Sequence, residues 1–202
     1  MRLLVEDLAC VRGERSLFRG LGFTVGAGEA LLVTGPNGAG KSSLLRLIAG
    51  FLRPAQGRIV LEGGDAEPSI GSAAHFVGHL DAVKGALSAA ENLAFARSLF
   101  GGGRAHADAA LARFGLQRLA SIPARMLSAG QRRRLALARL LVARRPLWLL
   151  DEPTSALDAE GQETLLALAN EHLSGGGLVV AATHAPLKFA RVRELRLGGG
   201  AA

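Results

Sequence analysis

The sequence predicts an α/β fold in which helices flank a mixed β-sheet. Short apolar runs alternate with helix-like segments along most of the 202 residues, and this alternation is typical of such folds. Two of the runs, 147–150 and 178–182, are apolar without interruption, as expected for strands that are buried on both faces. A third run, 30–33, leads into a glycine-rich loop and then into a helix-like segment, which makes a strand–loop–helix unit.

The first part of the chain is expected to form a small antiparallel β part. Strands are predicted from Leu3 to Val11 and from Leu17 to Val25, around a turn at Gly13-Glu14-Arg15. Further strands are predicted at 58–61, 74–77 and 192–197, the last of them at an edge of the sheet.

The middle of the chain is predicted to be helical. Residues 87–127 are expected to form two or three helices, which are broken at Gly101-Gly102-Gly103, Gly115 and Pro123. Two more helices are predicted from Gly130 to Ala143, with one apolar side, and from Ala159 to Leu173. A helical subdomain, residues 87–142 in rough bounds, is therefore predicted to be inserted into a single domain that spans residues 1–202.

The composition indicates a protein of the cytoplasm. No uninterrupted apolar stretch reaches the ~18 residues that suggest a membrane-spanning helix. The N-terminus carries Glu6 and Asp7 where a secretory signal needs apolar residues. The single Cys10 cannot form an internal disulfide, which agrees with a reducing compartment. It lies in a predicted strand, and we expect it to be a small buried residue.

The formal net charge of +7 is compatible with three interpretations: nucleic-acid binding, attraction to an anionic membrane, or an arginine-rich surface without a specific partner. Nucleic-acid binding favours a clustered basic face with stacking aromatic side chains. Here the arginines are scattered, the only tight cluster is Arg132-Arg133-Arg134, and tyrosine is absent. We therefore expect no nucleic-acid partner and favour the third interpretation, followed by proximity to a membrane.

The glycine-rich loop predicts a site for a nucleoside triphosphate. It reads Gly35-Pro36-Asn37-Gly38-Ala39-Gly40-Lys41-Ser42 and matches G-x-x-x-x-G-K-[ST] in full. The glycines allow the backbone to wrap around a polyphosphate with its N–H groups pointing inward, and the helix that follows adds a positive field. Lys41 is predicted to reach the β- and γ-phosphates and Ser42 to bind Mg²⁺. A glycine-rich turn before an ordinary helix is the alternative, which the full motif in this context disfavours.

A second motif, Leu147-Trp148-Leu149-Leu150-Asp151-Glu152, is an apolar strand that ends in two acids. In a parallel sheet this places the carboxylates at the same edge as the phosphate loop. Asp151 is predicted to hold Mg²⁺ through water, and Glu152 to polarise a water aimed at the γ-phosphate. Acids commonly end strands, so this motif alone is a weak indication of a nucleotide site. The complete phosphate loop earlier in the chain makes the indication strong.

A third motif, Leu127-Ser128-Ala129-Gly130-Gln131, opens the helix before Asp151. Ser128 is a natural N-cap, and the free N–H groups behind it can form a second anion site. Ser128 by itself could equally cap an ordinary helix. A second helix start suited to phosphate suggests that each nucleotide is shared between two subunits.

The order of these motifs, together with Ser155-Ala156-Leu157-Asp158 and Thr183-His184, resembles the ABC-type ATPases along the whole chain. The resemblance implies a P-loop NTPase fold of ABC type that binds ATP and Mg²⁺ and hydrolyses ATP as a homodimer. It implies that His184 contacts the γ-phosphate beside the catalytic Glu152. The nucleotide-binding residues that it implies are Gly35, Pro36, Asn37, Gly38, Ala39, Gly40, Lys41, Ser42, Ser43, Ser128, Gly130, Gln131 and Asp158.

Two positions depart from the family pattern. The family stacks adenine on an aromatic residue between the first two strands, where this chain has Arg12, and a guanidinium plane can also stack on a base. The family has a glutamine after the strand near Phe76, where it senses Mg²⁺ and the transporter, and this chain has His79. A neutral imidazole can bind water or metal, so His79 is predicted as a further residue of the metal site.

Less specific motifs resemble those of one branch of the family, the ATP-binding subunits of bacterial cytochrome c maturation, often called haem exporter ATPases. They include Gly78-His79-Leu80-Asp81-Ala82-Val83-Lys84, Glu91-Asn92-Leu93 and Thr183-His184-Ala185-Pro186-Leu187. The resemblance implies a peripheral subunit on the cytoplasmic face of the bacterial inner membrane. Its partners would be integral membrane permease subunits, and its role would be haem export or the release of a haem-loaded chaperone.

Three alternatives stay open. An ABC transport ATPase for another substrate would differ mainly in the loop near His79. A soluble ABC ATPase that acts on nucleic acid or ribosomes usually needs two ATPase units or a long coiled insertion, which this sequence lacks. A small-molecule kinase would not need Ser128-Ala129-Gly130-Gln131.

Overall fold

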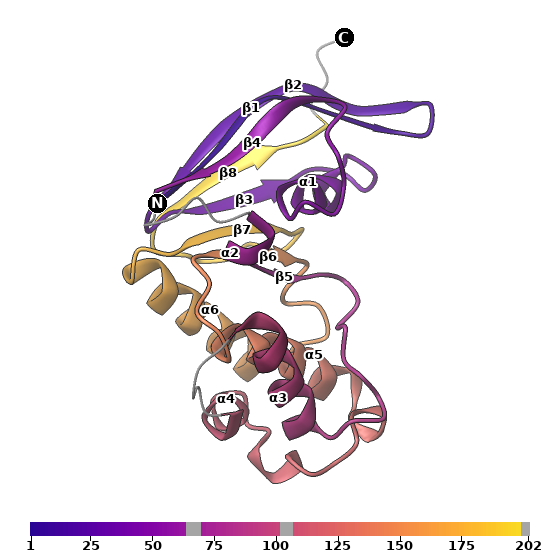
Figure 1. Ribbon diagram of the computed structural model, residues 1–202, viewed down its shortest axis with the longest axis vertical. Helices are drawn as coiled ribbons and strands as arrows, with labels where there is room; N and C mark the ends of the chain where they lie inside the picture. The colour runs from indigo at the N-terminus through magenta and orange to yellow at the C-terminus, as the bar shows by residue number, and fades with distance from the viewer. Residues whose placement is uncertain (64–69, 102–106, 199–202) are drawn as a thin grey trace. The chain divides into compact units, whose positions relative to one another are not determined.

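The computed structural model describes residues 1–63, 70–101 and 107–198 of the protein (Figure 1). The chain divides into two compact units. The first unit comprises Met1–Gly78, Pro146–Pro153 and Ala169–Ala202, and the second comprises His79–Arg145 and Thr154–Leu168. The helical segment predicted at 87–142 lies within the second unit, which also includes 154–168.

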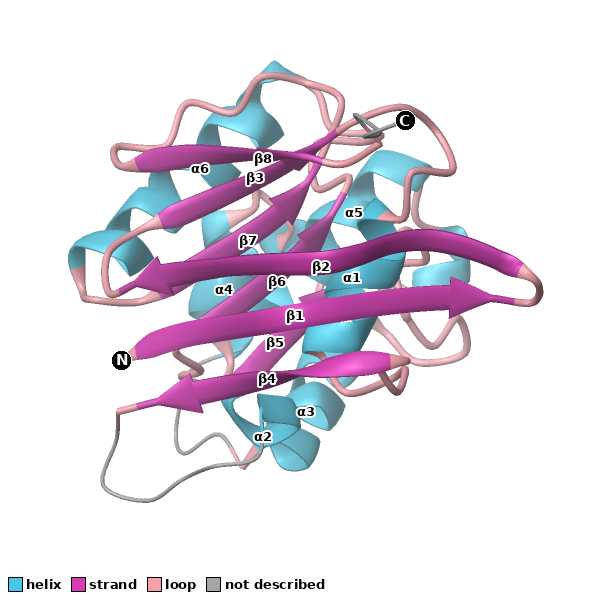
Figure 2. Ribbon diagram, turned by 90° about the horizontal axis from the view of Figure 1, so that it is seen from above, coloured by secondary structure: helices cyan, strands magenta, loops and turns pink. Residues whose placement is uncertain are grey.

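The first sheet of the first unit is antiparallel and has the strand order β2-β1-β4 (Figure 2). It consists of β1 (Arg2–Arg12), β2 (Arg15–Gly26) and β4 (Gln56–Glu62). β1 and β2 form the predicted hairpin, in which Arg12 pairs with Arg15 across the turn. β4 pairs with the other side of β1, and the predicted antiparallel part of the fold is thereby confirmed.

The second sheet of this unit is parallel and has the strand order β5-β6-β7-β3-β8. Its strands are β3 (Ala30–Thr34), β5 (Ala74–Val77), β6 (Leu147–Asp151), β7 (Leu178–Ala182) and β8 (Val192–Arg196). Every residue of β6 and β7 is buried, as their uninterrupted apolar sequences predicted. β8 lies at an edge, as predicted. The carboxyl ends of β3, β6 and β7 are neighbours, so the residues after these strands meet at one edge of the sheet.

Helix α1 (Lys41–Ile48) lies between the two sheets, as Figure 1 shows. It contributes fully buried leucines to one continuous core, which also contains the predicted buried Cys10. Members of this core from both sheets and from α1 are Leu3, Val5, Leu44, Leu45, Ile48, Leu149 and Val180. Burying one such side chain contributes about 2 kcal/mol, so the core holds α1, and the loop that precedes it, on a rigid support.

The second unit is helical, as predicted for the middle of the chain. It contains α3 (Ala89–Phe100), α4 (Ala107–Arg113), α5 (Ala129–Ala138), 3₁₀ turns at Gln117–Leu119, Ala124–Met126 and Arg139–Leu141, and α6 (Ala159–Ser174) as far as Leu168. The chain breaks after α3 at Gly101 and after α4 at Gly115, both in the left-handed conformation that favours glycine. The rest of the glycine run predicted to break the helices, 102–103, lies outside the described residues.

The helix predicted from Gly130 to Ala143 is shorter than expected. α5 ends at Ala138 and the chain continues as the 3₁₀ turn, which tightens the helix end and satisfies carbonyl groups there. The apolar side was predicted to consist of Leu135, Leu137, Ala138, Leu141 and Val142. Ala136 and Leu140, which were not included, are also buried. A short helix α2 (Ile70–Ala73) precedes β5 in the first unit and was not predicted. Within the described ranges, no helix is long and apolar enough to cross a membrane.

Candidate functional site

The glycine-rich loop connects β3 to α1, and two of its glycines combine a positive φ with a close neighbour. Gly35 has a φ of 134°, and a Cβ atom there would lie 2.2 Å from the carbonyl oxygen of Leu197. Gly40 has a φ of 100°, and its Cβ would lie 3.1 Å from the ring of Phe18 in β2. Any larger residue would therefore strain the loop and push it away from its neighbours. Phe18 and Leu197 help to set the loop, which no sequence motif had indicated.

Lys41 is almost fully buried within this loop. Its Nζ atom donates hydrogen bonds to the carbonyl oxygens of Gly35, at 2.8 Å, and Pro36, at 3.2 Å. The same atom lies 2.9 Å from Nε2 of His184. An ammonium group can only donate, so in this geometry Nε2 accepts and the neutral imidazole carries its proton on Nδ1. One buried cation thus lies between the phosphate loop and the segment after β7.

Ser42 and Asp151 bring together two oxygen atoms from separate elements. The Ser42 hydroxyl in α1 donates to Oδ1 of Asp151 at the end of β6, 2.9 Å away. Asp151 is only 3% exposed, and a carboxylate is costly to bury unless it is hydrogen-bonded or bound to a cation. Magnesium sites use oxygen ligands, commonly one or two carboxylates completed by phosphate oxygens and water. The two residues therefore fit the Mg²⁺ that the sequence predicts.

Glu152 follows Asp151 directly and has an unusual backbone conformation. Its φ of 46° lies in the left-handed region, which costs a non-glycine residue about 1 kcal/mol or more. The N–H group of Glu152 donates to the carbonyl oxygen of Ala182 at 2.8 Å, which ties this conformation to the end of β7. The turn leaves Oε1 of Glu152 3.7 Å from Nε2 of His184. The carboxylate of Glu152 and the imidazole of His184 are thus neighbours.

His184 projects from a turn that Thr183 stabilises. The buried Thr183 hydroxyl accepts a hydrogen bond from the N–H group of Ala185 at 2.9 Å, as in other turns made by threonine. The His184 side chain is half exposed. It approaches both Lys41 and Glu152, so three predicted residues from the ends of β3, β6 and β7 converge.

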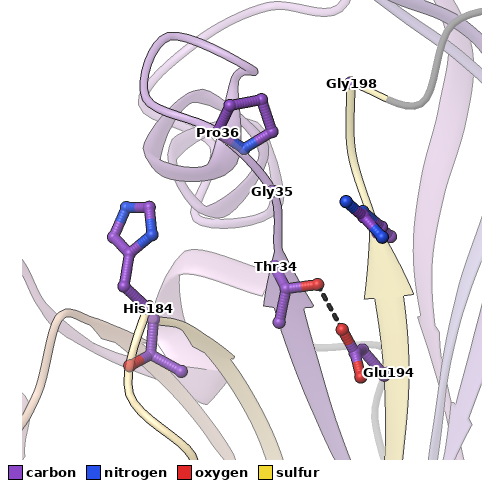
Figure 3. Close-up of a pocket in the computed structure, with 8 residues that line it drawn as sticks. Thr34, Gly35, Pro36, His184, Glu194 and Gly198 are labelled. Carbon is purple, nitrogen blue, oxygen red and sulfur yellow. Dashed lines mark hydrogen bonds between the residues drawn. The ribbon is translucent and has the colours of Figure 1, made fainter.

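A cavity of about 700 Å³ opens beside the phosphate loop (Figure 3). Its lining comes from the ends of β3 and β7 and from β8, and consists of Thr34, Gly35, Pro36, Thr183, His184, Glu194, Arg196 and Gly198. Thr34 donates to Oε1 of Glu194 at 2.5 Å across neighbouring strands. The volume is typical of a small-molecule site. The sequence did not single out Thr34, Glu194 or Arg196, because no motif marks residues that become neighbours only when β8 pairs with β3.

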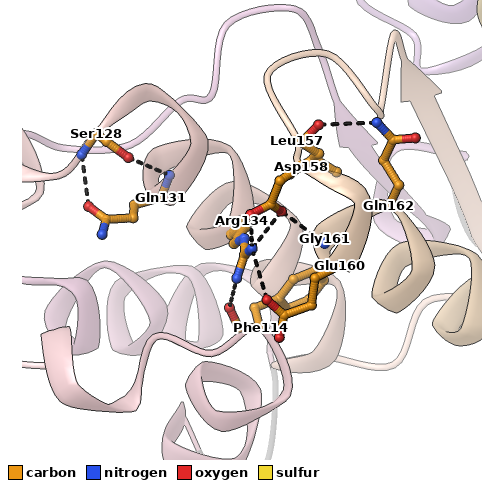
Figure 4. Close-up of polar contacts among 9 residues, drawn as sticks. All are labelled: Phe114, Ser128, Gln131, Arg134, Leu157, Asp158, Glu160, Gly161 and Gln162. Carbon is orange, nitrogen blue, oxygen red and sulfur yellow. Dashed lines mark hydrogen bonds and ion pairs between the residues drawn. The ribbon is translucent and has the colours of Figure 1, made fainter.

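The predicted second anion site lies in the second unit. The Ser128 hydroxyl accepts a hydrogen bond from the N–H group of Gln131 at 3.2 Å, and the Gln131 side chain accepts one from the N–H group of Ser128 at 2.9 Å (Figure 4). This reciprocal pair is a capping box, so the predicted N-cap of α5 is confirmed. Ser128 is exposed and accessible to a ligand.

The other predicted residues have different surroundings. Asp158 accepts hydrogen bonds from Arg134 at 2.5 and 2.6 Å (Figure 4). Arg12 is exposed at the end of β1, and His79 is exposed two residues after β5. Nucleotide binding by Arg12 and Asp158 and metal binding by His79 stay predictions.

The tight basic cluster in the sequence does not form an open basic patch. Arg133 is only 3% exposed, and its guanidinium lies 3.3 Å from the carboxylate of Asp81. Arg134 is 15% exposed and paired with Asp158. No motif indicated these two pairs, since their members are far apart along the chain.

Known proteins match the full length of the chain. The ABC transporter family model matches residues 18–155. The cytochrome c biogenesis ATP-binding export protein CcmA of Rhodopseudomonas palustris (strain BisB18) is 60% identical over 201 residues, with 100% of each chain covered. The protein of that name from Nitrobacter winogradskyi is 56% identical over 201 residues, with the same coverage.

A solved structure agrees with the fold. An ABC transporter ATP-binding protein from Pyrococcus furiosus is 26% identical, has a TM-score of 0.83, and is matched over 98% of each chain. The predicted fold class is therefore confirmed, with its parallel sheet, small antiparallel sheet and helices. From these matches, the chain belongs to the ABC transporter family, within the group of ATP-binding proteins of cytochrome c biogenesis.

Proposed function

We propose that the protein is the ATP-hydrolysing subunit of a membrane export complex in c-type cytochrome biogenesis. The observation that carries the proposal is the convergence of Lys41, Ser42, Asp151, Glu152 and His184 at the carboxyl ends of three parallel strands. A buried cation, an oxygen pair that fits Mg²⁺ and a carboxylate beside an imidazole are the groups that phosphoryl transfer to water requires. The names of the relatives supply the biological setting.

The phosphates of ATP bind to the loop from Gly35 to Ser43. In the structure, Lys41 donates to two carbonyl oxygens of this loop. Phosphate oxygens carry negative charge and are stronger acceptors than carbonyl groups, so Lys41 turns to the β- and γ-phosphates when ATP binds. The N–H groups at the start of α1 complete the binding of the phosphates.

Ser42, through its hydroxyl group, and Asp151, through water, would hold Mg²⁺. The bound ion would neutralise negative charge on the β- and γ-phosphate oxygens. We assign His79 to the same metal site, as a substitute for the glutamine of the family. Its imidazole has to be neutral to accept a bond from water or to bind metal.

Glu152 accepts a hydrogen bond from the attacking water and aims it at the γ-phosphate. As the water attacks the γ-phosphorus, its proton passes to this carboxylate. The bond from the γ-phosphorus to the β-phosphate oxygen breaks, and ADP and phosphate are the products. Lys41 releases Nε2 of His184 when it turns to the phosphates. In its other neutral tautomer, the imidazole then donates a hydrogen bond from Nε2 to the γ-phosphate.

Two copies of the chain close head-to-tail around two ATP molecules. Each nucleotide then contacts the loop at Lys41 of one copy and the start of α5 in the other, at Ser128, Gly130 and Gln131. The exposed cap at Ser128 and the free N–H groups behind it supply the second set of anion contacts. Asp158 lies on the same shared surface, and Arg12 stacks on adenine.

The membrane partners are permease subunits, and the protein lies peripherally on the cytoplasmic face of the inner membrane. Closing and reopening of the ATPase pair moves the permease helices, with the loop near His79 as the contact. His79→Ala is expected to leave ATP binding nearly intact but to lower ATPase activity in the membrane complex. Normal ATPase activity and normal cytochrome c assembly in this variant would make His79 a structural residue only.

The assignment of the phosphate site is tested with Lys41→Ala. Turnover of ATP is expected to fall about a hundredfold or more, because the β/γ charge loses its fixed cation. The measurement is steady-state phosphate release by the purified full chain, and the exposed Lys188 provides the matched control Lys188→Ala. Turnover at the wild-type rate in Lys41→Ala would refute the site.

The role of Glu152 and the dimer are tested together with Glu152→Gln. The amide keeps the shape of the carboxylate but cannot take up a proton, so ATP binds and the closed pair accumulates. Gel filtration with ATP should show twice the monomer mass of 20.9 kDa. Rapid hydrolysis by this variant would contradict the proposed base.

A further inference from the structure

Helix α5 and the loop before α6 are joined by an ion pair (Figure 4). Nη2 of Arg134 lies 2.5 and 2.6 Å from the two carboxylate oxygens of Asp158, and 3.4 Å from Oε2 of Glu160. Nη1 of the same guanidinium donates to the carbonyl oxygen of Phe114 at 3.2 Å. Arg134 is 15% exposed, whereas Asp158 is 64% exposed. The arginine is thus fixed by its surroundings and holds a more exposed partner.

A second contact, independent of the first, joins the same two segments. A Cβ atom at Gly130 in α5 would lie 3.0 Å from the carbonyl oxygen of Ala156. This distance is tighter than an ordinary van der Waals contact, so glycine lets the helix and the loop lie close together at this point. Ala156 has a φ of 61°, so the loop adopts a left-handed turn where it reaches the start of α5. The helix and the loop therefore approach each other at two places, at Gly130 and at Arg134, four residues apart along α5.

The carboxylate of Asp158 is oriented by its own helix as well. Its Oδ1 accepts a hydrogen bond from the N–H group of Gly161 at 3.0 Å, so Asp158 caps the first turn of α6. The hydrogen bond from Arg134, followed by that from Gly161, lowers the pKa of Asp158. The carboxylate is therefore ionised at neutral pH and keeps its charge-assisted bond to Arg134.

From these contacts we infer that Arg134 is a positioning residue, which holds the Asp158 loop and the Ser128 end of α5 as one element. The inference rests on the proposed function, in which Ser128 and Asp158 meet the nucleotide bound to the second copy. Ser128 lies on the first turn of the helix that carries Arg134, and Asp158 lies at the other end of the ion pair. Arg134 itself touches no nucleotide. Its task is to present two nucleotide-facing groups at a fixed spacing.

The spacing between Ser128 and Asp158 is expected to affect the rate of ATP turnover, and not the first binding of ATP. ATP binds initially to the loop at Lys41 in the same chain, and Arg134 is not among the residues proposed to hold it there. The Ser128 and Asp158 groups are used only when two copies close. Loss of the ion pair should therefore lower kcat and leave KM for ATP nearly unchanged.

A double-mutant cycle tests the pair. Arg134→Gln removes the charge and keeps a donor, and Asp158→Asn removes the charge and keeps a good N-cap. Arg134→Gln is expected to lower kcat about tenfold. Asp158→Asn should lower it at least as much, since it also alters a nucleotide-facing group. The double variant is expected to be no worse than Asp158→Asn, because its Arg134 partner is already lost. Arg118→Ala, in an exposed 3₁₀ turn, is the matched control and should keep the wild-type rate.

Three further readouts separate the possible outcomes. ATP binding by isolated subunits, measured with a fluorescent ATP analogue, should be unchanged in Arg134→Gln. In the Glu152→Gln background, Arg134→Gln should reduce the dimer formed with ATP in gel filtration. Arg134→Lys, which keeps the charge but not the planar fork, should recover part of kcat.

Additive losses in the cycle, an unchanged kcat in Arg134→Gln, or equal loss of ATP binding and turnover would each overturn the inference. Lys41→Ala is assayed beside these variants, so that failure of the positioning role can be distinguished from failure of the proposed function. If Lys41→Ala hydrolyses ATP normally, the site itself is wrong. If Lys41→Ala is inactive and Arg134→Gln is not impaired, only the positioning role fails.

Discussion

Helices α3 and α5 begin with the same kind of capping box, and the comparison shows that the two helix starts differ in charge. Ser88 accepts from the N–H group of Glu91 at 3.2 Å, and Ser128 accepts from that of Gln131 at the same distance. In both helices the third residue returns a hydrogen bond to the serine N–H group, at 2.7 Å in α3 and 2.9 Å in α5. The backbone geometry is therefore nearly identical.

The two boxes differ in the charge of the returning side chain. Glu91 places a carboxylate in the first turn of α3, and its hydrogen bonds with Ser88 lower the pKa of that carboxyl group. The first turn of α5 contains no acid. There the neutral amide of Gln131 accepts the hydrogen bond from the serine N–H group. A helix start carries a partial positive charge. In α3 the chain neutralises this charge itself, whereas in α5 it remains available for an external anion.

The largest expected effect comes from giving α5 the charge of α3. Gln131→Glu should keep the capping box and the fold, but its carboxylate would repel a phosphate at the helix start. We expect ATP turnover to fall about a hundredfold, with a melting temperature equal to or above that of the wild type. The mirror variant Glu91→Gln should leave turnover unchanged. Equal turnover in the two variants would contradict the proposed difference between the helices, because the charge at the start of α5 would then matter no more than that at the start of α3.

A smaller effect is expected from removing each serine. Ser128→Ala and Ser88→Ala should each lower the free energy of unfolding by about 1 kcal/mol, since both lose the same cap. Only Ser128→Ala should also lower kcat, by about tenfold, because only that hydroxyl faces a nucleotide in the proposed dimer. Denaturant unfolding and phosphate release measure the two effects separately. A loss of turnover in Ser88→Ala of the same size would show that stability alone explains both.

The smallest effect is a difference in pH dependence. The pKa of Glu91 is lower in the folded chain than its ordinary value of 4.5. Its contribution to stability is therefore fully present above pH 4.5, and it is lost as the pH falls through the lowered pKa. Gln131 does not titrate, so the α5 box should not change in this range. NMR titration should show the amide signal of Ser88 moving below pH 4.5 while that of Ser128 stays constant.

The phosphate loop and its partners show where prediction from sequence was sufficient. Residues 35–42 form one continuous motif, so the loop and its binding role could be expected without knowledge of the fold. Asp151 and Glu152 could be placed at the same edge because a parallel sheet aligns the ends of its strands. The end of α5 at Ala138 could not be placed, since local sequence there favours a longer helix and packing on all sides decides the outcome.

By itself, the sequence determined the features that neighbouring residues encode: the strand–loop–helix unit, the two strands buried on both faces, and the cap at Ser128. These depend on short-range sterics, hydrogen bonds and the side-chain period, which are properties of a local segment. Only the tertiary structure decided that Lys41 meets His184 and that Arg134 holds Asp158. Such contacts depend on strand order and on packing between segments far apart in the chain, and no local pattern in the sequence specifies them.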